Sequence, residues 1–445
     1  MKKTLLFIAG AVFALQTPVL AQRTCGDEAL RASIIARDPG AAAFFEDQKR
    51  AMQVVVEEQS SNPAAQKTTA VSAIPVIFHI VLDTAKYIQL GGATGVKRRV
   101  DSQIAVLTRD FNRGNFDSTL IPAGFKPLFG NAGIKFGLAH TAPNGKGTPG
   151  YEVRIVTATS FTSISTAFSA VKHSASGGLD GWDYNKYFNV WVLNFDDANL
   201  LGIATPRSFT PMFYPANEMG VCVNYRAFGK RVAASDVYIS GIDKGRTLTH
   251  EVGHFFTMRH IWGDDAGCPA SGGPDDGIAD TPPQADQTFG SPTGPIFDAC
   301  VTGGNGIMWM NYMDYTDDGA MHMFTKNQAT AMASKIATTG ENYSLTQNPN
   351  LLLYPVGVAE VNAEPSFEVY PNPSAGVISI ALGTADDDLS AISVTNMLGQ
   401  QVMAISTAGT KEKLYSIDLS AMSKGIYLVK CNFASGSVTR KITLQ

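Results

Sequence analysis

The chain has 445 residues, which is long enough for two or three domains that each bury a core of their own. Its formal net charge of -4 at pH 7 provides no basic surface for a nucleic acid, so we expect no nucleic-acid partner. Charged residues make up only 17% of the chain, which favours an extracellular, strand-rich protein over a cytosolic helical one.

Residues 1–21 have the features of a secretion signal. Lys2 and Lys3 precede an apolar run from Leu5 to Leu15, and small residues ending at Ala21 offer a cleavage site. The run is too short to span a bilayer comfortably, and no later segment is long and apolar enough for a membrane helix. We therefore expect an exported protein, secreted or held at the cell surface, with no membrane span after processing.

Residues 22–67 differ in composition from the rest of the chain and predict a short pro-segment. They are rich in Ala, Glu and Gln, which indicates helices that are loosely packed. The segment ends in a linker-like composition, Ser60 to Lys67, that is open to proteolysis.

Residues 68–348 predict a mixed α/β domain. Runs of β-branched and apolar residues indicate strands, and apolar residues at helical spacing indicate an amphipathic helix over residues 96–111. Strands are expected at Ile74–Leu82, Ile134–Leu138, Tyr187–Leu193 and Gly220–Tyr225. Further helices are expected from Arg246 to about Thr257 and from Thr325, whose capping partner would be Gln328.

The C-terminal part is different again. A linker over residues 349–365 leads into residues 366–445, where short alternating strands are separated by Gly and Pro. This pattern predicts a small all-β sandwich. Its strands are expected at Val377–Ala381, Ile392–Thr395, Ile426–Cys431 and Val438–Leu444.

The segment that begins at Thr249 holds three histidines at metal-ligand spacing. His250 and His254 are four residues apart on a predicted helix, so they share one face and can bind one ion. Imidazole suits zinc, and three protein ligands leave one position open for water. Glu251 lies beside the first ligand, where its carboxylate can accept a proton from that water. His260 reaches the same ion only if the helix ends before it; ordinary helix-face histidines are the alternative.

The long form of this motif resembles the metzincin proteases. The segments Ile261–Asp265 and Asn311–Asp318 are similar to the pappalysin-like family within that group, which includes the ulilysin and mirolysin proteases. The resemblance implies an α/β (α+β) zinc endopeptidase that cleaves proteins or peptides. It implies that Met313 lies under the zinc and that Tyr315 donates its hydroxyl to the oxyanion. Judged singly, the two would be a core residue and a packing residue.

One position departs from the metzincin pattern. The family has glycine three residues after the second histidine, where the chain turns sharply, and this chain has Thr257. A β-branched residue tolerates positive φ poorly. The turn therefore has another geometry, carries strain, or leaves His260 imperfectly placed. The last outcome defines the alternative function: a non-catalytic, zinc- and calcium-bound surface or adhesion protein with a degenerate protease site.

Two other segments carry the resemblance. Asn199–Ala204 is similar to the family's edge strand above the cleft, where an extended peptide adds as a strand; an ordinary loop is the alternative. Asp275–Pro282 lacks EF-hand spacing but resembles the family's calcium loop. That likeness implies calcium ligands from Asp276, Thr281 and the Ile278 carbonyl, against a solvated acidic turn.

The five cysteines are Cys25, Cys222, Cys268, Cys300 and Cys431. An odd number in an oxidising compartment leaves at least one thiol to explain. The resemblance implies a disulfide between Cys268 and Cys300, while the family's second pair falls on Ser291 and Ala320. In family members that prefer arginine after the scissile bond, an aspartate directly precedes the cysteine of the second pair whose position here is Ala320. The position of that aspartate is Gly319 here, which implies a weak arginine preference.

The remaining motifs lie near the two ends. Arg23–Gly26 resembles the family's cysteine switch, which implies that the Cys25 thiolate binds zinc in the latent form. Cys222 and Cys431 are more simply buried thiols. Three tail segments resemble the C-terminal sorting domain of type IX secretion, which implies that machinery as a partner; a carbohydrate- or surface-binding sandwich is the alternative. These segments are Tyr370–Gly376, Met397–Gln400 and Lys424–Tyr427.

Overall fold

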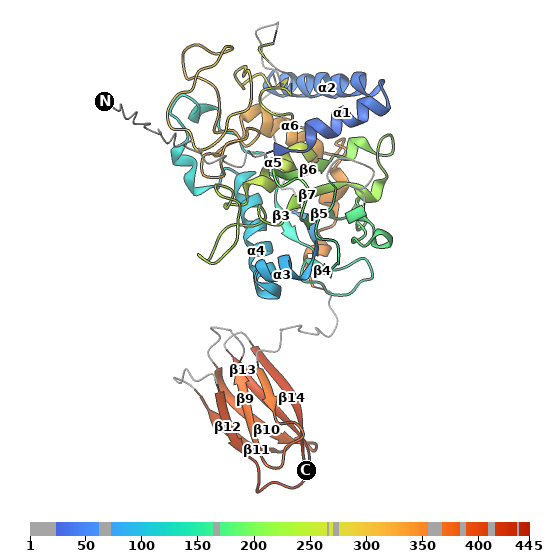
Figure 1. Ribbon diagram of the computed structural model, residues 1–445, viewed down its shortest axis with the longest axis vertical. Helices are drawn as coiled ribbons and strands as arrows, with labels where there is room; N and C mark the ends of the chain where they lie inside the picture. The colour runs from blue at the N-terminus through green and yellow to red at the C-terminus, as the bar shows by residue number, and fades with distance from the viewer. Residues whose placement is uncertain are drawn as a thin grey trace, which may run out of the picture. The chain divides into compact units, whose positions relative to one another are not determined.

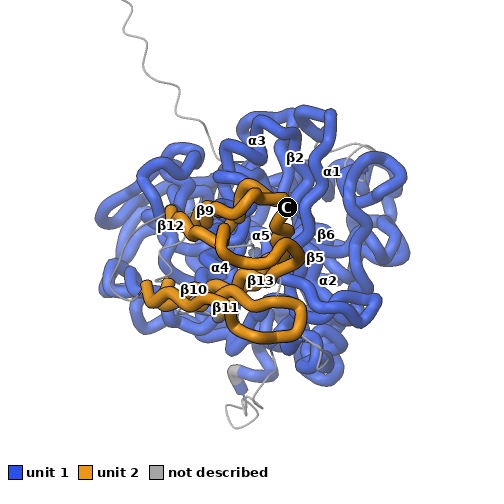
Figure 2. Tube along the Cα trace, turned by 90° about the horizontal axis from the view of Figure 1, so that it is seen from below, with its two compact units in different colours: residues 1–355 blue, residues 356–445 orange. Residues whose placement is uncertain are grey.

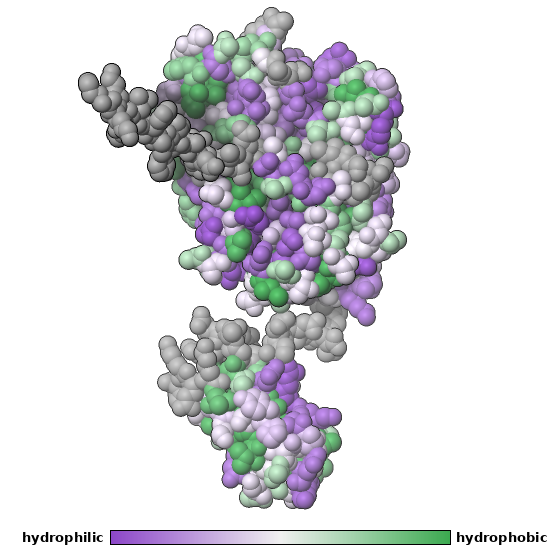
Figure 3. All heavy atoms as spheres, in the orientation of Figure 1, coloured by the Kyte–Doolittle hydropathy of each residue, from purple (hydrophilic) through white to green (hydrophobic). Residues whose placement is uncertain are grey.

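The computed structural model describes residues 24–61, 73–162, 170–264, 267–269, 276–354, 367–382, 389–407, 414–433 and 436–445. The predicted signal segment, Arg23, Asp275 and most of the predicted linker lie outside these residues. Two compact units divide the chain, residues 1–355 and residues 356–445 (Figures 1 and 2). On the face in view in Figure 3, hydrophobic and hydrophilic residues are interspersed over both units.

Unit 1 is built on a seven-stranded sheet in the order β1-β6-β7-β5-β2-β3, with β4 also paired to β2. Neighbouring strands are parallel except β6 and β7. Strands β2, β5 and β7 are buried along their whole length, as the continuous apolar runs predicted. The strands are β1 (Thr24–Cys25), β2 (Ile74–Leu82), β3 (Phe136–Leu138), β4 (Tyr151–Ile155), β5 (Phe188–Leu193), β6 (Leu200–Thr205) and β7 (Gly220–Asn224).

Helices of unit 1 pack on this sheet to form the main core. The helix α6 begins with the predicted capping box, in which the Thr325 hydroxyl accepts from the Gln328 amide and the Gln328 side chain accepts from the Thr325 amide. The helices are α1 (Asp27–Arg37), α2 (Ala41–Ser61), α3 (Thr84–Gln89), α4 (Gly92–Asp110), α5 (Arg246–Phe255) and α6 (Lys326–Ile336). Short 3₁₀ turns lie at Phe116–Leu120, Lys126–Leu128, Ser174–Ser176, Arg207–Phe209, Ala216–Glu218, Tyr343–Gln347 and Pro349–Leu352.

Helices α1 and α2 of the predicted pro-segment lie side by side at one end of unit 1 (Figure 1). The expectation of loose packing is wrong, because both helices share the cores of the protease part. Leu30, Ile34 and Phe45 belong to a buried cluster with side chains of β2, β5, β6 and β7. Met52 and Val56 join the main core. The prediction failed because the composition of the segment is polar on average, although each helix has a narrow apolar stripe. The residues that these stripes contact lie far away in the sequence.

Unit 2 contains two antiparallel sheets that share one core, as predicted for a sandwich. One sheet has the order β11-β10-β13-β14 and the other β12-β9-β8. The strands are β8 (Phe367–Tyr370), β9 (Val377–Leu382), β10 (Leu389–Asn396), β11 (Gln401–Ser406), β12 (Leu414–Asp418), β13 (Gly425–Phe433) and β14 (Gly436–Leu444). Among the described residues of both units, no helix has the length and apolarity needed to cross a bilayer.

Candidate metal centre and cleft

The three histidines of the motif meet at one buried point. Helix α5 carries His250 and His254 one turn apart, and the chain returns to bring His260 beside them. The His254 Nε2 atom lies 3.1 Å from Nε2 of His250 and 3.1 Å from Nε2 of His260. All three side chains are fully buried.

Hydrogen bonds at the opposite ring nitrogens explain why these Nε2 atoms face one another. Nδ1 of His250 lies 2.7 Å from the Tyr312 carbonyl oxygen, and Nδ1 of His254 lies 2.8 Å from that of Met258. Nδ1 of His260 bonds the Asp264 carboxylate. With a proton on each Nδ1, three Nε2 lone pairs converge and repel one another unless a cation lies between them. The donor set therefore fits zinc, with each ligand held by an acceptor at its other nitrogen.

The turn between His254 and His260 carries backbone strain that a glycine would relieve. Helix α5 ends at Phe255, and Thr257 adopts a φ of 67° in the left-handed region. Its amide donates to the His254 carbonyl at 2.8 Å, and the Met258 amide donates to the Gly253 carbonyl at 3.0 Å. Three outcomes are possible for Thr257, and the structure shows the strained turn. A non-glycine residue in this backbone conformation costs about 1–3 kcal/mol of stability.

Glu251 is buried on α5 against strand β6. A Cβ atom at Gly202 of β6 would lie only 2.5 Å from the Glu251 Cγ and Oε1 atoms, so glycine is required for the strand to pass this carboxylate. Gly202 has no role predicted from the sequence, because nothing in the linear order reveals which residue of β6 faces α5.

Aromatic rings form one wall of the site. The Trp262 ring stacks on His260 with centroids 4.3 Å apart, and Tyr315 approaches His260 edge-on at 4.9 Å. Met313 lies under α5, since a Cβ atom at Gly253 would collide with its sulfur. The sequence alone assigns no role to Trp262 or Asp264. The feature that could have indicated one is their position directly after the third histidine.

Cys25 enters the site from the predicted pro-segment. Strand β1 pairs in parallel with β6, with Cys25 opposite Gly202. The Cys25 sulfur lies within 4.8 Å of the ligand nitrogens of the three histidines and donates to Glu251 Oε2 at 3.4 Å. Its amide donates to the Tyr315 hydroxyl at 3.1 Å. Burial and the Glu251 and Asp27 carboxylates raise the pKa of the thiol, so the protein groups alone favour the protonated form.

Residues of the expected calcium loop also lie together. Asp276 Oδ1 accepts from the Ile278 amide at 2.9 Å and from the Thr281 hydroxyl at 2.8 Å. The other carboxylate oxygen of Asp276 is buried with no hydrogen-bond partner among the described residues. Burial raises the pKa of Asp276 to about 8, and Asp280 adds to the increase. A buried oxygen of this kind requires a proton or a cation.

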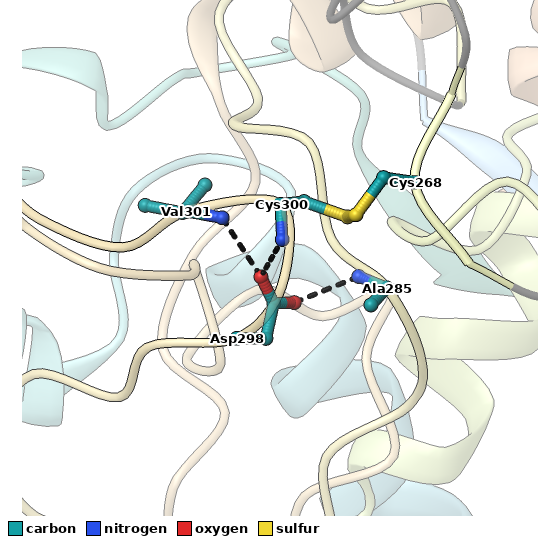
Figure 4. Close-up of a disulfide and its surroundings, with 5 residues drawn as sticks. All are labelled: Cys268, Ala285, Asp298, Cys300 and Val301. Atoms are coloured by element: carbon teal, nitrogen blue, oxygen red, sulfur yellow. Dashed lines mark hydrogen bonds between the residues drawn. A yellow bond between two sulfur atoms is a disulfide. The ribbon is translucent and has the colours of Figure 1, made fainter.

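The loop between α5 and Met313 is tied by the predicted disulfide, Cys268–Cys300 (Figure 4). The Asp298 carboxylate supports it by accepting from the Cys300 amide at 2.8 Å and the Ala285 amide at 2.7 Å. Where the family's second disulfide is missing, the Ser291 hydroxyl donates to Asp317 at 2.8 Å. Cys25, Cys222 and Cys431 are buried and free.

The fold and the histidine site define a metzincin-type zinc protease. Comparison with known proteins agrees: residues 177–337 match the peptidase M43 family, described as pregnancy-associated plasma protein-A. Residues 368–445 match a secretion system C-terminal sorting domain.

Solved structures narrow the family further. The chain is 35% identical to a promirolysin variant from Tannerella forsythia, covering 74% of this chain and 98% of that one with a TM-score of 0.62. It is 38% identical to mature mirolysin of that organism in complex with a cleaved peptide, over 64% of this chain and 98% of that one, with a TM-score of 0.57. The chain therefore belongs to the pappalysin family of zinc metalloproteases.

Curated relatives include an extracellular metalloprotease from Arthroderma otae, 29% identical over 42% of this chain and 64% of its own length. Another, from Colletotrichum graminicola, is 44% identical over 28% of this chain and 44% of its own length. The chain thus covers less than two thirds of these relatives. The sorting domain and the extracellular relatives assign the protein to the cell exterior, secreted or at the cell surface.

Proposed function

We propose that the chain is a zinc-dependent endopeptidase, made as a latent precursor, that hydrolyses peptide bonds in protein or peptide substrates. One observation carries the proposal: two histidines and a carboxylate of α5 meet a third histidine and a tyrosine hydroxyl from later segments in one buried site. His250, His254 and His260 would hold the zinc. When bound, zinc supplies a Lewis acid that polarises the scissile carbonyl and makes water more acidic.

Glu251 is the proposed general base. Its carboxylate would take a proton from the attacking water and pass it to the leaving amine. Gly202 keeps β6 close to this carboxylate, which holds its position relative to a peptide bound along the strand. Tyr315 would donate its hydroxyl to the oxygen that becomes negative during attack. In the precursor that hydroxyl accepts from the Cys25 amide, so it becomes available when the pro-segment leaves.

Latency is assigned to the pro-segment. Cys25 would be the fourth zinc ligand, and its strand β1 covers the edge of β6 that an extended substrate needs. Two further assignments rest on the unsatisfied Asp276 oxygen and on the sorting-domain match. Asp276, Thr281 and the Ile278 carbonyl would bind calcium, and the C-terminal unit would engage the type IX secretion machinery.

The test of the catalytic proposal is Glu251→Ala in the mature protein. Turnover of casein should fall at least ~10²-fold, the usual scale for loss of a general base. Zinc content, measured by atomic absorption, should be unchanged because the three histidines remain. Glu368→Ala, in the separate C-terminal unit, is the control and should keep full turnover. Retained proteolysis in Glu251→Ala at full zinc occupancy would show that another group is the base.

The alternative, a non-catalytic surface or adhesion protein, depends on Thr257 displacing His260. His260 lies beside the other two histidines despite the strained turn. If zinc-loaded mature protein hydrolysed neither casein nor any member of a peptide library, that result would favour the alternative.

A further inference from the structure

Helix α2 covers an aromatic surface of the protease part. Its residue Phe44 packs edge-on against Phe213 with ring centroids 5.2 Å apart, and Phe45 packs against Phe209 at 5.6 Å. Tyr214 continues this surface, and its hydroxyl accepts from Arg37 of α1 at 3.2 Å. We call Phe209, Phe213 and Tyr214 the aromatic platform. All three belong to the protease part, directly after strand β6.

A buried cation borders the covered surface. Arg259 is only 8% exposed. Its guanidinium donates to the Phe45 carbonyl at 3.1 Å and to Glu46 Oε1 at 3.0 Å, and both acceptors belong to α2. Both hydrogen bonds come from the same guanidinium nitrogen, Nη2. Aromatic rings and arginine are the side chains that contribute most to binding at protein interfaces.

Removal of the pro-segment uncovers this combination of groups. Phe209, now 1% exposed, loses the ring of Phe45, and Arg259 loses both hydrogen-bond acceptors. The vacated surface adjoins the strand beside the site. Strand β6, which carries Gly202 next to Glu251, ends at Thr205, and its residues Leu200 and Ile203 share a buried cluster with Phe209 of the platform. Arg259 directly precedes His260 in the chain. A substrate lying along β6 can therefore reach the platform with a neighbouring part of the same molecule.

We propose that the aromatic platform and Arg259 form an exosite in the mature protease. The exosite binds a helical segment of a protein substrate that presents two successive aromatic residues followed by an acidic one. The aromatic side chains occupy the positions of Phe44 and Phe45, and the acidic side chain pairs with Arg259 as Glu46 does. This inference depends on the proposed function, in that it concerns the enzyme after its pro-segment has left.

The test compares three substrates that share one cleavable peptide. The first is the short fluorogenic peptide alone. The second carries residues 38–61 of this chain, joined through a flexible Gly-Ser linker. The third is identical except for Phe44→Ala, Phe45→Ala and Glu46→Gln. None contains Cys25, so the attached helix has no thiol to enter the zinc site. With the mature enzyme, we expect KM for the second substrate to be about tenfold lower than for the third, the effect of one or two interface hot spots.

Matched enzyme variants locate the effect. Phe213→Ala should remove the difference between the second and third substrates while kcat/KM for the short peptide stays unchanged. Met212→Ala is the control, because this neighbouring side chain is already 64% exposed. Equal KM values for the second and third substrates, or a difference that survives Phe213→Ala, would overturn the exosite.

Failure of the exosite and failure of the proposed function give different results. If the short peptide is not hydrolysed at all, the catalytic proposal fails. The exosite is then measured by fluorescence anisotropy of labelled residues 38–61 added to the mature protein. Binding that Phe213→Ala weakens and Met212→Ala does not would support the exosite, and no difference between the variants would refute it.

Discussion

Thr257 holds a backbone conformation that its own side chain opposes. Its φ of 67° suits glycine, which would relieve a cost of about 1–3 kcal/mol. We therefore expect Thr257→Gly to raise the melting temperature of the zinc-loaded protein and its zinc affinity. Ala337→Gly, at a position with an ordinary φ of -67°, is the control and should lower the melting temperature. If the two substitutions shift the melting temperature alike, the turn at Thr257 is not strained.

We expect cleavage specificity to depend on a single position as well, Gly319. Gly319 has no side chain, and the nearest side-chain atom to a Cβ placed there is the Lys244 ammonium, 3.8 Å away. Asp318 is fully buried and accepts from the Lys244 and Arg246 amides at 2.8 and 3.2 Å, while Asp317 binds Ser291. Because Gly319 stands where the arginine-preferring relatives have an aspartate, we expect an arginine after the scissile bond to lack the charged partner at this position, which is worth about 2–3 kcal/mol.

Mapping of cleavage sites in a peptide library should thus show medium or large apolar residues after the cut and little arginine. Gly319→Asp combined with Lys244→Ala should introduce an arginine preference, because the ammonium would otherwise pair with the new carboxylate. Strong arginine enrichment in the unmodified enzyme would contradict this prediction.

At the scale of secondary-structure elements, ion pairs hold the start of helix α5 in place. Arg246, the first residue of α5, is bound by Asp117 through two hydrogen bonds of 2.7 and 2.6 Å. Burial raises the pKa of the Asp117 carboxyl, but His322 and Arg246 outweigh this and hold that pKa well below its usual range. Its contribution to the free energy of unfolding is therefore present above pH ~4, the unfolded value, and is lost as the pH falls towards the folded value.

Asp117→Asn should accordingly lower the free energy of unfolding at pH 7 by about 1–3 kcal/mol, since one member of a partly buried pair is removed. Urea titrations at several pH values should show this deficit shrinking below pH ~4. Asp101→Asn, which breaks an exposed pair with Lys97 on α4, is the control and should change little. A deficit that is constant down to pH 3 would mean that the charge of Asp117 does not stabilise the fold.

At the scale of the whole molecule, the short strand β1 covers a site that is formed by the rest of unit 1. Cys25→Ala should leave β1 on the sheet but remove the sulfur from the histidine cluster. We expect the purified precursor of this variant to hydrolyse a short fluorogenic peptide, or to mature early, whereas Cys431→Ala should stay as latent as the wild type. Equal latency of both variants would mean that β1 inhibits by steric cover alone.

Much of this architecture could be predicted because it depends on patterns between residues that are close in the sequence. The apolar run Ile74–Leu82 has the same bounds as β2, and the three histidines with Glu251 lie on and after α5 as their spacing required. Local spacing suffices there because a helix turn places residues four apart on one face. The family motifs extended the prediction to Met313, Tyr315 and the Cys268–Cys300 disulfide.

Other features exist only because distant segments meet. Gly202 lies beside Glu251, and Asp117 binds Arg246, through the packing of elements that no sequence period connects. The pro-segment looked loosely packed because its few apolar side chains acquire partners only on the folded protease part. The sequence by itself thus determined the class of protein and predicted its metal ligands, through motifs of fixed spacing. Only the tertiary structure decided that Thr257 is strained, that β1 occupies the edge of β6, and that α2 covers the aromatic platform, because each depends on contacts between residues far apart in the chain.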